Sequence, residues 1–289
     1  MNLSDISTVR RVMSMFGLRF RKEFGQNFLT DGSIVEEIAA ACSTDPDCTV
    51  LEIGPGIGTL TRALAENYRS VVALEIDEAL LPVLQFTLSD FGNVTVHRAD
   101  VLKTNLAELL KPSFEEGKVA VCANLPYYIT SPILMYLLES RLPFSSITVM
   151  VQEEVADRIC ANPGTKDYGA ITPVIGYYAS AQKLFRVHAD RFLPVPKVDS
   201  AVVRLTLWSD AERPCHPQSE DLFFKTIKAA FGQRRKTLLN ALSSGFPNLT
   251  KEQLCGAIAS LGLDPTIRGE RLSVEQFSDL SDAIGSLRN

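Results

Sequence analysis

The feature that most constrains the fold is an alternation of short β-branched segments with amphipathic ones between about Thr49 and Val151. β-Branched segments favour strands, and apolar residues spaced at i, i+3 and i+4 favour helices. The pattern predicts strands at 49–54, 70–77, 94–100, 118–124 and 146–152 and helices at 59–67, 79–88 and 131–140. Strands that alternate with helices form βαβ units, so the sequence predicts an α/β domain whose parallel sheet is covered on both faces.

The pattern changes after Glu153. A loop with the sequence NPGTKDYG precedes a helix, and two more strands are expected at 184–188 and 200–208 as an antiparallel edge. The segment RFLPVPKVDS between these strands contains two prolines, which cannot donate to a strand ladder, so we predict an extended loop. From about Pro217 every segment has a helical pattern, with Thr250 and Ser273 as N-caps.

We therefore expect three parts along the chain. Residues 1–21 would form a mobile N-terminal extension, residues 22–216 the α/β domain, and residues 217–289 a small all-helical domain. A chain of 289 residues is long enough for a large and a small domain.

Composition excludes several classes of protein. The hydrophobic fraction of 46% and the charged fraction of 22% are those of a globular protein, and no apolar run approaches the roughly 20 residues of a membrane span. Arginines at 10, 11, 19 and 21 interrupt any signal-peptide core, so we expect a cytoplasmic protein. The six cysteines have no CxxC spacing and the three histidines do not cluster with them, so no metal site is expected.

A glycine-rich turn, LEIGPGIG, ends the first predicted strand and begins a helix. Gly54, Gly56 and Gly58 allow the backbone to turn sharply and to approach a ligand closely. Such a turn places the ligand at the carboxyl ends of the strands. The dinucleotide fingerprint GxGxxG would require a third glycine at position 59, which is Thr59, and this opposes a dinucleotide oxidoreductase.

The order ExGxGxG resembles the first motif of class I methyltransferases. Glu75 ends the second strand, 21 residues after Gly54, where a carboxylate can accept from both hydroxyls of a ribose. Asp100 ends the third strand, where methyltransferases usually keep an acid that contacts the adenine amine. A single acid at a strand end is a surface residue by default, but three strand ends with suitable residues in order favour a nucleoside site.

The sequence Asn124-Leu125-Pro126-Tyr127 follows the fourth strand and resembles motif IV of the amino-methyltransferases. The lone pair of an exocyclic amine is delocalised into the ring, so that nitrogen is a poor nucleophile. The Asn124 side-chain oxygen and the Leu125 carbonyl, directed by Pro126, can accept its two hydrogens and favour a reactive nitrogen. Tyr127 can stack on an extruded base.

A second aromatic side chain should cover the other face of that base. Phe192, in the proline-rich loop, is our candidate for this catalytic role. Tyr128 and Tyr168 are expected to be packing residues instead.

Together these motifs resemble the KsgA-type 16S ribosomal RNA adenine dimethyltransferases, from about Lys22 to the C-terminus. The most specific segments are GQNFL, NLPYYI, FLPVPKVDS and FGQRRKTL. The resemblance implies a class I S-adenosylmethionine-dependent methyltransferase at residues 22–216 and an rRNA-contacting helical domain at residues 217–289. It implies dimethylation of two adjacent adenosines in the 3′-terminal hairpin of small-subunit rRNA. The implied cofactor contacts are Asn27, Leu29, Gly54, Gly56, Glu75, Asp100 and Asn124.

Two alternatives remain open. The Erm-type enzymes, which modify large-subunit rRNA, share the catalytic motifs, although FGQRRKTLLNAL and GERLSVEQF favour the KsgA-type interpretation. A non-catalytic RNA-binding assembly factor would keep the fold without needing Glu75, Asp100 or NLPY. Glu52 stands where many methyltransferases have Asp, a departure that this family commonly tolerates.

The expected partner is 16S rRNA in the 30S subunit or its precursor, bound by a monomer with no obligatory protein partner and no membrane. The net charge of −5 and the pI of about 5.4 argue weakly against a nucleic-acid partner. The distribution of charge argues for one, because the segment 225–236 carries five cations and no acid. We predict that these cations bind phosphates beside the active site: Lys225, Lys228, Arg234, Arg235 and Lys236.

Reversing Arg234 and Arg235 to Glu should weaken rRNA binding and flatten its salt dependence by about 0.7–0.9 log units per lost phosphate contact. The affinity for S-adenosylmethionine should not change, because the cofactor would bind at the strand ends. Binding to 30S particles measured over a range of salt concentrations tests this. An unchanged salt slope would make the cluster a solvated helix face and would point to the N-terminal arginines.

Overall fold

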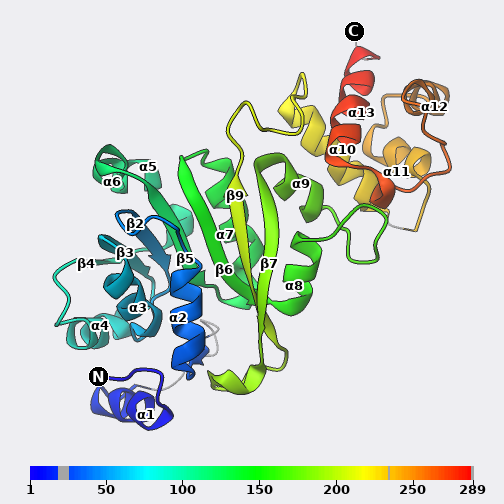
Figure 1. Ribbon diagram of the computed structural model, residues 1–289. Coiled ribbons are helices and arrows are strands. Elements are labelled where there is room, and N and C mark those ends of the chain that lie inside the picture. Colours follow the sequence, from blue (N-terminus) through cyan, green and yellow to red (C-terminus); the bar gives the residue numbers. More distant parts are fainter. Residues whose placement is uncertain (19–25, 234, 288–289) are drawn as a thin grey trace. The chain divides into compact units, whose positions relative to one another are not determined.

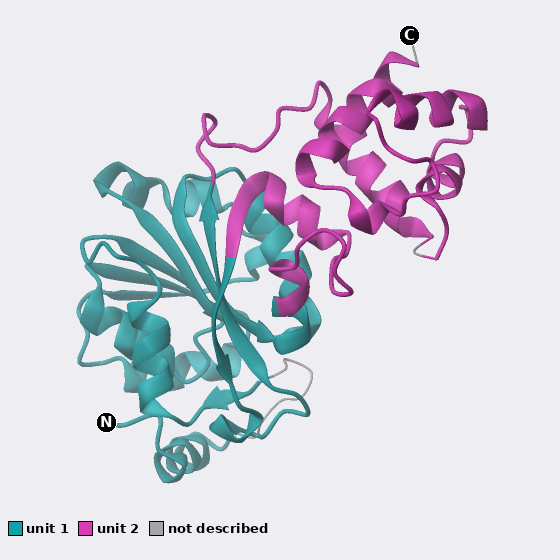
Figure 2. Cartoon of the chain, turned by 45° about the vertical axis from the view of Figure 1, so that its right-hand side comes forward, with its two compact units in different colours: residues 1–156, 182–207 teal, residues 157–181, 208–289 magenta. Residues whose placement is uncertain are grey.

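The structure is a computed structural model that describes residues 1–18, 26–233 and 235–287 (Figure 1). The chain divides into two compact units, which Figure 2 distinguishes by colour. Unit 1 contains Met1–Ala156 and Gln182–Leu207, and unit 2 contains Asp157–Ala181 and Trp208–Asn289. In the described residues, no helix is long and apolar enough to cross a membrane.

A seven-stranded sheet forms in the described part of the chain, in the order β4-β3-β2-β5-β6-β9-β7. Neighbours among the first five strands are parallel, and β9 runs antiparallel to β6. This arrangement confirms the predicted α/β fold and the five predicted strands. The strand bounds are β2 Thr49–Ile53, β3 Ser70–Glu75, β4 Val94–Arg98, β5 Val119–Asn124, β6 Phe144–Gln152, β7 Ala179–Val187 and β9 Ser200–Leu207.

Helices cover both faces of the sheet. Figure 1 shows α2 and α3 on one face and α7 on the other. All five residues of the central strand β2 are buried, as expected for a parallel strand covered on both sides. The predicted helices correspond to α3 Thr59–Asn67, α4 Leu81–Thr87 and α7 Thr130–Glu139, and the structure adds α2 Gly32–Ala40, α5 Leu106–Leu109, α6 Lys111–Glu116 and α8 Glu153–Ile159.

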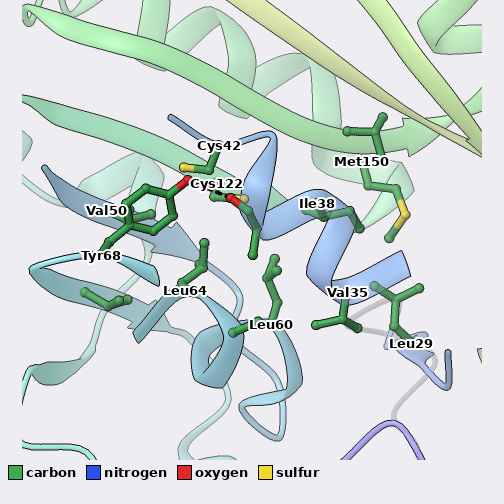
Figure 3. Packing of buried hydrophobic residues seen from close by; sticks show 14 of the residues in the cluster. Leu29, Val35, Ile38, Cys42, Val50, Leu60, Leu64, Tyr68, Cys122 and Met150 are labelled. Carbon is green, nitrogen blue, oxygen red and sulfur yellow. Dashed lines mark hydrogen bonds between the residues drawn. The ribbon is translucent and has the colours of Figure 1, made fainter. Parts of the chain in front are cut away.

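The core between α2, α3 and the sheet is built from interlocking apolar side chains (Figure 3). Val50 and Cys122 from the strands meet Ile38 and Leu64 from the helices. Tyr68 closes one end of this core, and its hydroxyl donates to the Ala39 carbonyl at 2.7 Å. This packing holds the start of α3 against β2, and so fixes the turn between them.

The N-terminal segment is packed rather than extended. Helix α1, Ile6–Met15, begins at Asp5, whose side chain accepts from the Thr8 amide at 2.8 Å. Its buried residues Val9, Val12 and Met13 share an apolar cluster with residues of the glycine turn and α4. Residues 1–18 are therefore packed in this structure, where an amphipathic helix buries its apolar face, and the mobility expected for residues 1–21 stays a prediction. Residues 19–21 lie outside the described ranges.

A short antiparallel pair, missed from the sequence, joins β1 (Phe28–Leu29) to β8 (Phe192–Leu193). In its register Leu29 lies opposite Phe192. The segment 191–200 is thus not wholly a loop. Its prolines follow the two paired residues, so they do not prevent this pairing.

Unit 2 contains α9 Ile171–Tyr178, α10 Glu220–Gly232, α11 Leu238–Gly245, α12 Lys251–Ser260 and α13 Val274–Ser286. Thr250 and Ser273 form capping boxes at the starts of α12 and α13, as predicted. The Tyr168 hydroxyl donates to the Leu272 carbonyl at 2.8 Å, which joins residues 157–181 to the C-terminal helices. We predicted a single domain boundary at residue 216. The two units instead divide the chain after residues 156, 181 and 207.

Candidate functional site

A pocket of unit 1 opens at the carboxyl ends of β2, β3, β4 and β5. It encloses about 1070 Å³, its open mouth included, which is the size range of small-ligand sites. Every predicted cofactor-binding residue contributes to its lining, and so do the four residues of the NLPY motif. These residues are Asn27, Leu29, Gly54, Gly56, Glu75, Asp100, Asn124, Leu125, Pro126 and Tyr127.

The glycine turn needs its glycines for conformation and for space. Gly54, Gly56 and Gly58 have φ angles of +71°, +62° and +89°, which side chains disfavour. A Cβ atom on Gly56 would also lie 2.9 Å from Cε1 of Phe28. The turn therefore presents bare backbone to the pocket, as close approach of a ligand requires.

Glu75 is fixed by backbone amides on both sides. Its Oε2 accepts from the Gly56 amide at 3.1 Å, and its Oε1 accepts from the Asp77 amide at 2.8 Å. Burial raises the pKa of Glu75, although the two amides favour its charged form. Each carboxylate oxygen can accept a second hydrogen bond, so the group is positioned to receive hydroxyl donors from a ligand.

Glu52 is a pocket residue that our reasoning from the sequence did not include in the site. Its side chain is 1% exposed, and Oε2 has no hydrogen-bond partner among the described residues. Burial raises the pKa of Glu52 to about 8, and the nearby charge of Glu75 adds to this rise. A buried acceptor without a partner is costly; the Thr61 hydroxyl, which also has no partner among the described residues, lies close enough to lower the pKa of Glu52, so this hydroxyl or a ligand donor would stabilise the group. Glu52 is the first residue of the ExGxGxG motif, so the sequence did point to it. From the sequence we considered only that many methyltransferases have Asp at this position.

Asn124 connects the end of β5 to the segment before β1. Its Nδ2 donates to the Asn27 carbonyl at 3.0 Å, which leaves Oδ1 as the acceptor of the amide. Asp100, at the end of β4, accepts from the Leu102 amide at 3.1 Å and forms an ion pair with Lys103 at 3.3 Å. The predicted polar residues are thus brought together from four strand ends.

Tyr127 is held at the pocket by one hydrogen bond. Its hydroxyl lies 2.7 Å from Oγ of Ser200, at the start of β9. The Leu125 amide donates to the Met150 carbonyl of β6 at 3.2 Å, which anchors the NLPY motif to the sheet. Burial raises the pKa of Tyr127, so its hydroxyl stays neutral and acts as a hydrogen-bonding group.

The structure does not bring Phe192 to the pocket. This side chain is 2% exposed and belongs to the core cluster beneath α2 and α3. The pairing of β8 with β1 turns it inward, where burial of the ring is favourable. Tyr168 is a packing residue as expected. Tyr128 is not, because it is exposed and lines the pocket.

The predicted RNA-binding cations belong to unit 2. Lys225, Lys228, Arg235 and Lys236 are exposed on α10 and in the turn after it. Arg234 lies outside the described residues. Lys225 places Nζ 4.9 Å from the centroid of the Phe246 ring. A role for these cations beside the pocket stays a prediction.

Comparisons with known proteins agree with this geometry. Residues 17–285 match the family described as ribosomal RNA adenine dimethylase. A ribosomal RNA small subunit methyltransferase A of Lachnoclostridium phytofermentans is 48% identical over 284 residues, covering 98% of this chain and 97% of that protein. A protein of the same name from Streptococcus sanguinis is 47% identical over 290 residues, covering 99% of each chain.

Two solved structures are also similar. A dimethyladenosine transferase from Plasmodium falciparum has a TM-score of 0.71 and 25% identity, with 88% of this chain and 95% of that chain covered. The 23S rRNA methyltransferase ErmE has a TM-score of 0.66 and 27% identity, with 90% of this chain and 100% of that chain covered. The α/β fold with its pocket is therefore that of a class I methyltransferase.

The buried acid Glu52 should make stability depend on pH. Its pKa is raised in the folded protein from an ordinary value of 4.5 to about 8, so the folded state binds more protons than the unfolded state between these values. Stability is therefore lost as pH rises through this window. We expect Glu52→Gln to be more stable than the wild type at pH 8, by on the order of a few kcal/mol, and close to it near pH 5.

Denaturant unfolding of the ligand-free protein at several pH values measures this effect. Glu36→Gln, which changes an exposed carboxylate on α2, is the matched control and should follow the wild-type profile. Identical profiles for Glu52→Gln and the wild type would mean that Glu52 has an ordinary pKa in the folded protein.

Proposed function

The chain belongs to the ribosomal RNA adenine dimethylase family, and from this premise we propose its substrate and mechanism. It is an S-adenosylmethionine-dependent rRNA adenine dimethyltransferase. The proposed substrate is the pair of adjacent adenosines in the 3′-terminal hairpin of 16S rRNA, and each is dimethylated at N6 during small-subunit biogenesis. The observation that carries this proposal is the NLPY motif, held at the edge of a pocket whose other wall has a fixed carboxylate.

The pocket fits the cofactor on two observations. The glycine turn leaves open space at Gly54, where an added Cβ atom would meet no atom within 4 Å, and Oε2 of Glu52 is a buried acceptor without a partner in the described residues. Glu75 would hold the ribose hydroxyls, and Asp100 the adenine amine. Glu52 would accept from a further polar donor of the cofactor. When bound, S-adenosylmethionine supplies an electrophilic methyl group.

The residues of β5 and its following turn would act on the adenine. Oδ1 of Asn124 and the carbonyl of Leu125 accept the two N6 hydrogens, which draws the lone pair out of conjugation with the ring. Asn27 fixes the Asn124 amide in this orientation by accepting from Nδ2. The nitrogen becomes cationic when it acquires the methyl group, and its proton then leaves without needing a strong general base.

Tyr127 would bind the extruded adenine by stacking, worth about 1–3 kcal/mol. Ser200 holds the ring by its hydroxyl, which lowers the conformational entropy lost on binding. Phe192 was our candidate for the opposite face of the base, and in this structure it lies in the core.

For the rRNA partner, we propose binding to the 30S subunit or its precursor as a monomer in the cytoplasm. The exposed cations Lys225, Lys228, Arg235 and Lys236 support phosphate contacts of unit 2. The names of the relatives at 47–48% identity favour the small subunit as the substrate. The likeness to ErmE is lower in identity and leaves the large subunit as the alternative to be tested.

The proposed activity predicts methyl incorporation from labelled S-adenosylmethionine into 30S particles. We expect little incorporation into 50S particles or naked DNA, because neither contains the hairpin. Mapping of the product should place two methyl groups on each of two adjacent adenosines. Preferential labelling of 50S particles would instead indicate the Erm-type function, and binding to 30S particles without labelling would indicate a non-catalytic assembly factor.

Asn124→Ala should lower the single-turnover rate of methyl transfer far more than it lowers rRNA affinity, because the Oδ1 acceptor is needed most in the transition state. The test uses saturating S-adenosylmethionine, since Asn124 also lines the cofactor pocket. Glu75→Ala is the contrasting variant and should weaken cofactor binding by about 1–3 kcal/mol. An Asn124→Ala enzyme with full activity would remove Asn124 from the mechanism.

A further inference from the structure

One exposed aromatic side chain at the pocket is not used by the chemistry described above. Tyr128 follows the NLPY motif, is 63% exposed, and lines the same pocket as Tyr127. No hydrogen bond holds its hydroxyl among the described residues, in contrast to the bond between Tyr127 and Ser200. A large apolar ring left in water is stabilised when a flat ligand covers it.

Tyr128 is also distinct from the other aromatic side chains of the pocket. Phe28 is buried in the cluster beneath α1, and Tyr127 is half-buried. Within the described part of the chain, Tyr128 is the one aromatic residue that both lines the pocket and counts as exposed. It therefore offers a ring at the mouth of the pocket rather than in its interior.

The local backbone separates the two tyrosines. Tyr127 and Tyr128 are the first two residues of a 3₁₀ helix, η4 Tyr127–Ile129. Such a helix has three residues per turn, so consecutive side chains diverge by about 120°. The two rings cannot face the same base from the same side, and each is available to a different nucleotide.

We propose that Tyr128 is a stacking platform for the nucleotide adjacent to the adenosine that is being methylated. This inference rests on the proposed function, in which one adenine leaves the RNA stack and enters the pocket. Extrusion leaves its neighbour with one uncovered face. An aromatic side chain at the pocket mouth can cover that face, because stacking on an aromatic ring accepts any base.

The platform bears on the order of events at two adjacent adenosines. When one adenine occupies the pocket, the other stacks on Tyr128, and the two exchange places for the second modification. A dimethylated adenine keeps its flat ring and gains two methyl groups, so it can still stack on the platform. One exposed tyrosine therefore serves both halves of the reaction as a positioning residue.

The test compares Tyr128→Ala and Tyr128→Phe with the wild type on 30S particles reconstituted with a synthetic 3′ rRNA segment. Tyr128→Ala should lower kcat/KM by about 5- to 100-fold, the equivalent of one lost stacking contact. Tyr128→Phe should stay within about 2-fold, because the hydroxyl takes no part in stacking. The matched control Phe86→Ala removes an exposed ring of α4 outside the pocket and should leave kcat/KM unchanged.

A double change identifies which nucleotide is stacked. An abasic site beside the target adenosine should lower wild-type kcat/KM by a similar factor and should cause no further loss with Tyr128→Ala. The proposal would be overturned if the abasic site and Tyr128→Ala together lowered kcat/KM by the product of their separate factors. That result would show that Tyr128 and the neighbouring base act separately. Unchanged kcat/KM for Tyr128→Ala on the natural sequence would also overturn it.

A second measurement separates this inference from the proposed function. A 2-aminopurine beside the target adenosine should lose fluorescence when wild-type protein binds the particle, and should lose less with Tyr128→Ala. Equal quenching by both proteins would overturn the platform even if methylation occurs. Quenching that depends on Tyr128 without any methyl transfer would retain the platform and reject the proposed activity.

Discussion

The hydrogen bond between the Gly56 amide and the Glu75 carboxylate is the interaction on which the site depends. It joins the turn after β2 to the end of β3, and so fixes two walls of the pocket at once. The carboxylate is buried, as is a second acid of the pocket, Glu52; burial raises the pKa of both groups, and the charge of Glu75 adds to the rise at Glu52. Burying two acids is unfavourable without donors; the Gly56 and Asp77 amides supply them to Glu75, whereas Oε2 of Glu52 has none among the described residues, so a polar ligand is favoured there.

The two units have different physical tasks. Unit 1 contributes a pocket of fixed polar atoms and aromatic rings, suited to recognising a cofactor and a single base. Unit 2 exposes cations that would contact the RNA backbone without reading its sequence. The net charge of −5 does not oppose the proposed RNA contact, because local charge rather than the total decides the contact with phosphates.

Much of the fold could be predicted because the spacing of apolar residues along the sequence follows which side chains are buried. The fully buried strand β2 and the amphipathic helix α10 matched the predicted segments for this reason. The pairing of β1 with β8 could not be predicted, because two residues are too few to show a pattern. The burial of Phe192 and the exposure of Tyr128 could not be predicted, because a proline-rich sequence does not show which ring faces the core and a tyrosine beside a motif does not show its exposure. Glu52 was overlooked because the sequence does not show that its Oε2 atom is buried without a hydrogen-bond partner among the described residues; this is visible only in the structure.

The packing of α1 has a practical consequence for handling the protein. Ile57, within the glycine turn, shares an apolar cluster with Val9 and Val12, and the Thr59 hydroxyl donates to the Leu3 carbonyl at 3.4 Å. The first residues of the chain thus brace the loop that faces the cofactor. Deleting the first residues of the chain would remove the Leu3 contact and expose this apolar cluster, whereas an affinity tag attached at the exposed Met1 would not enter it.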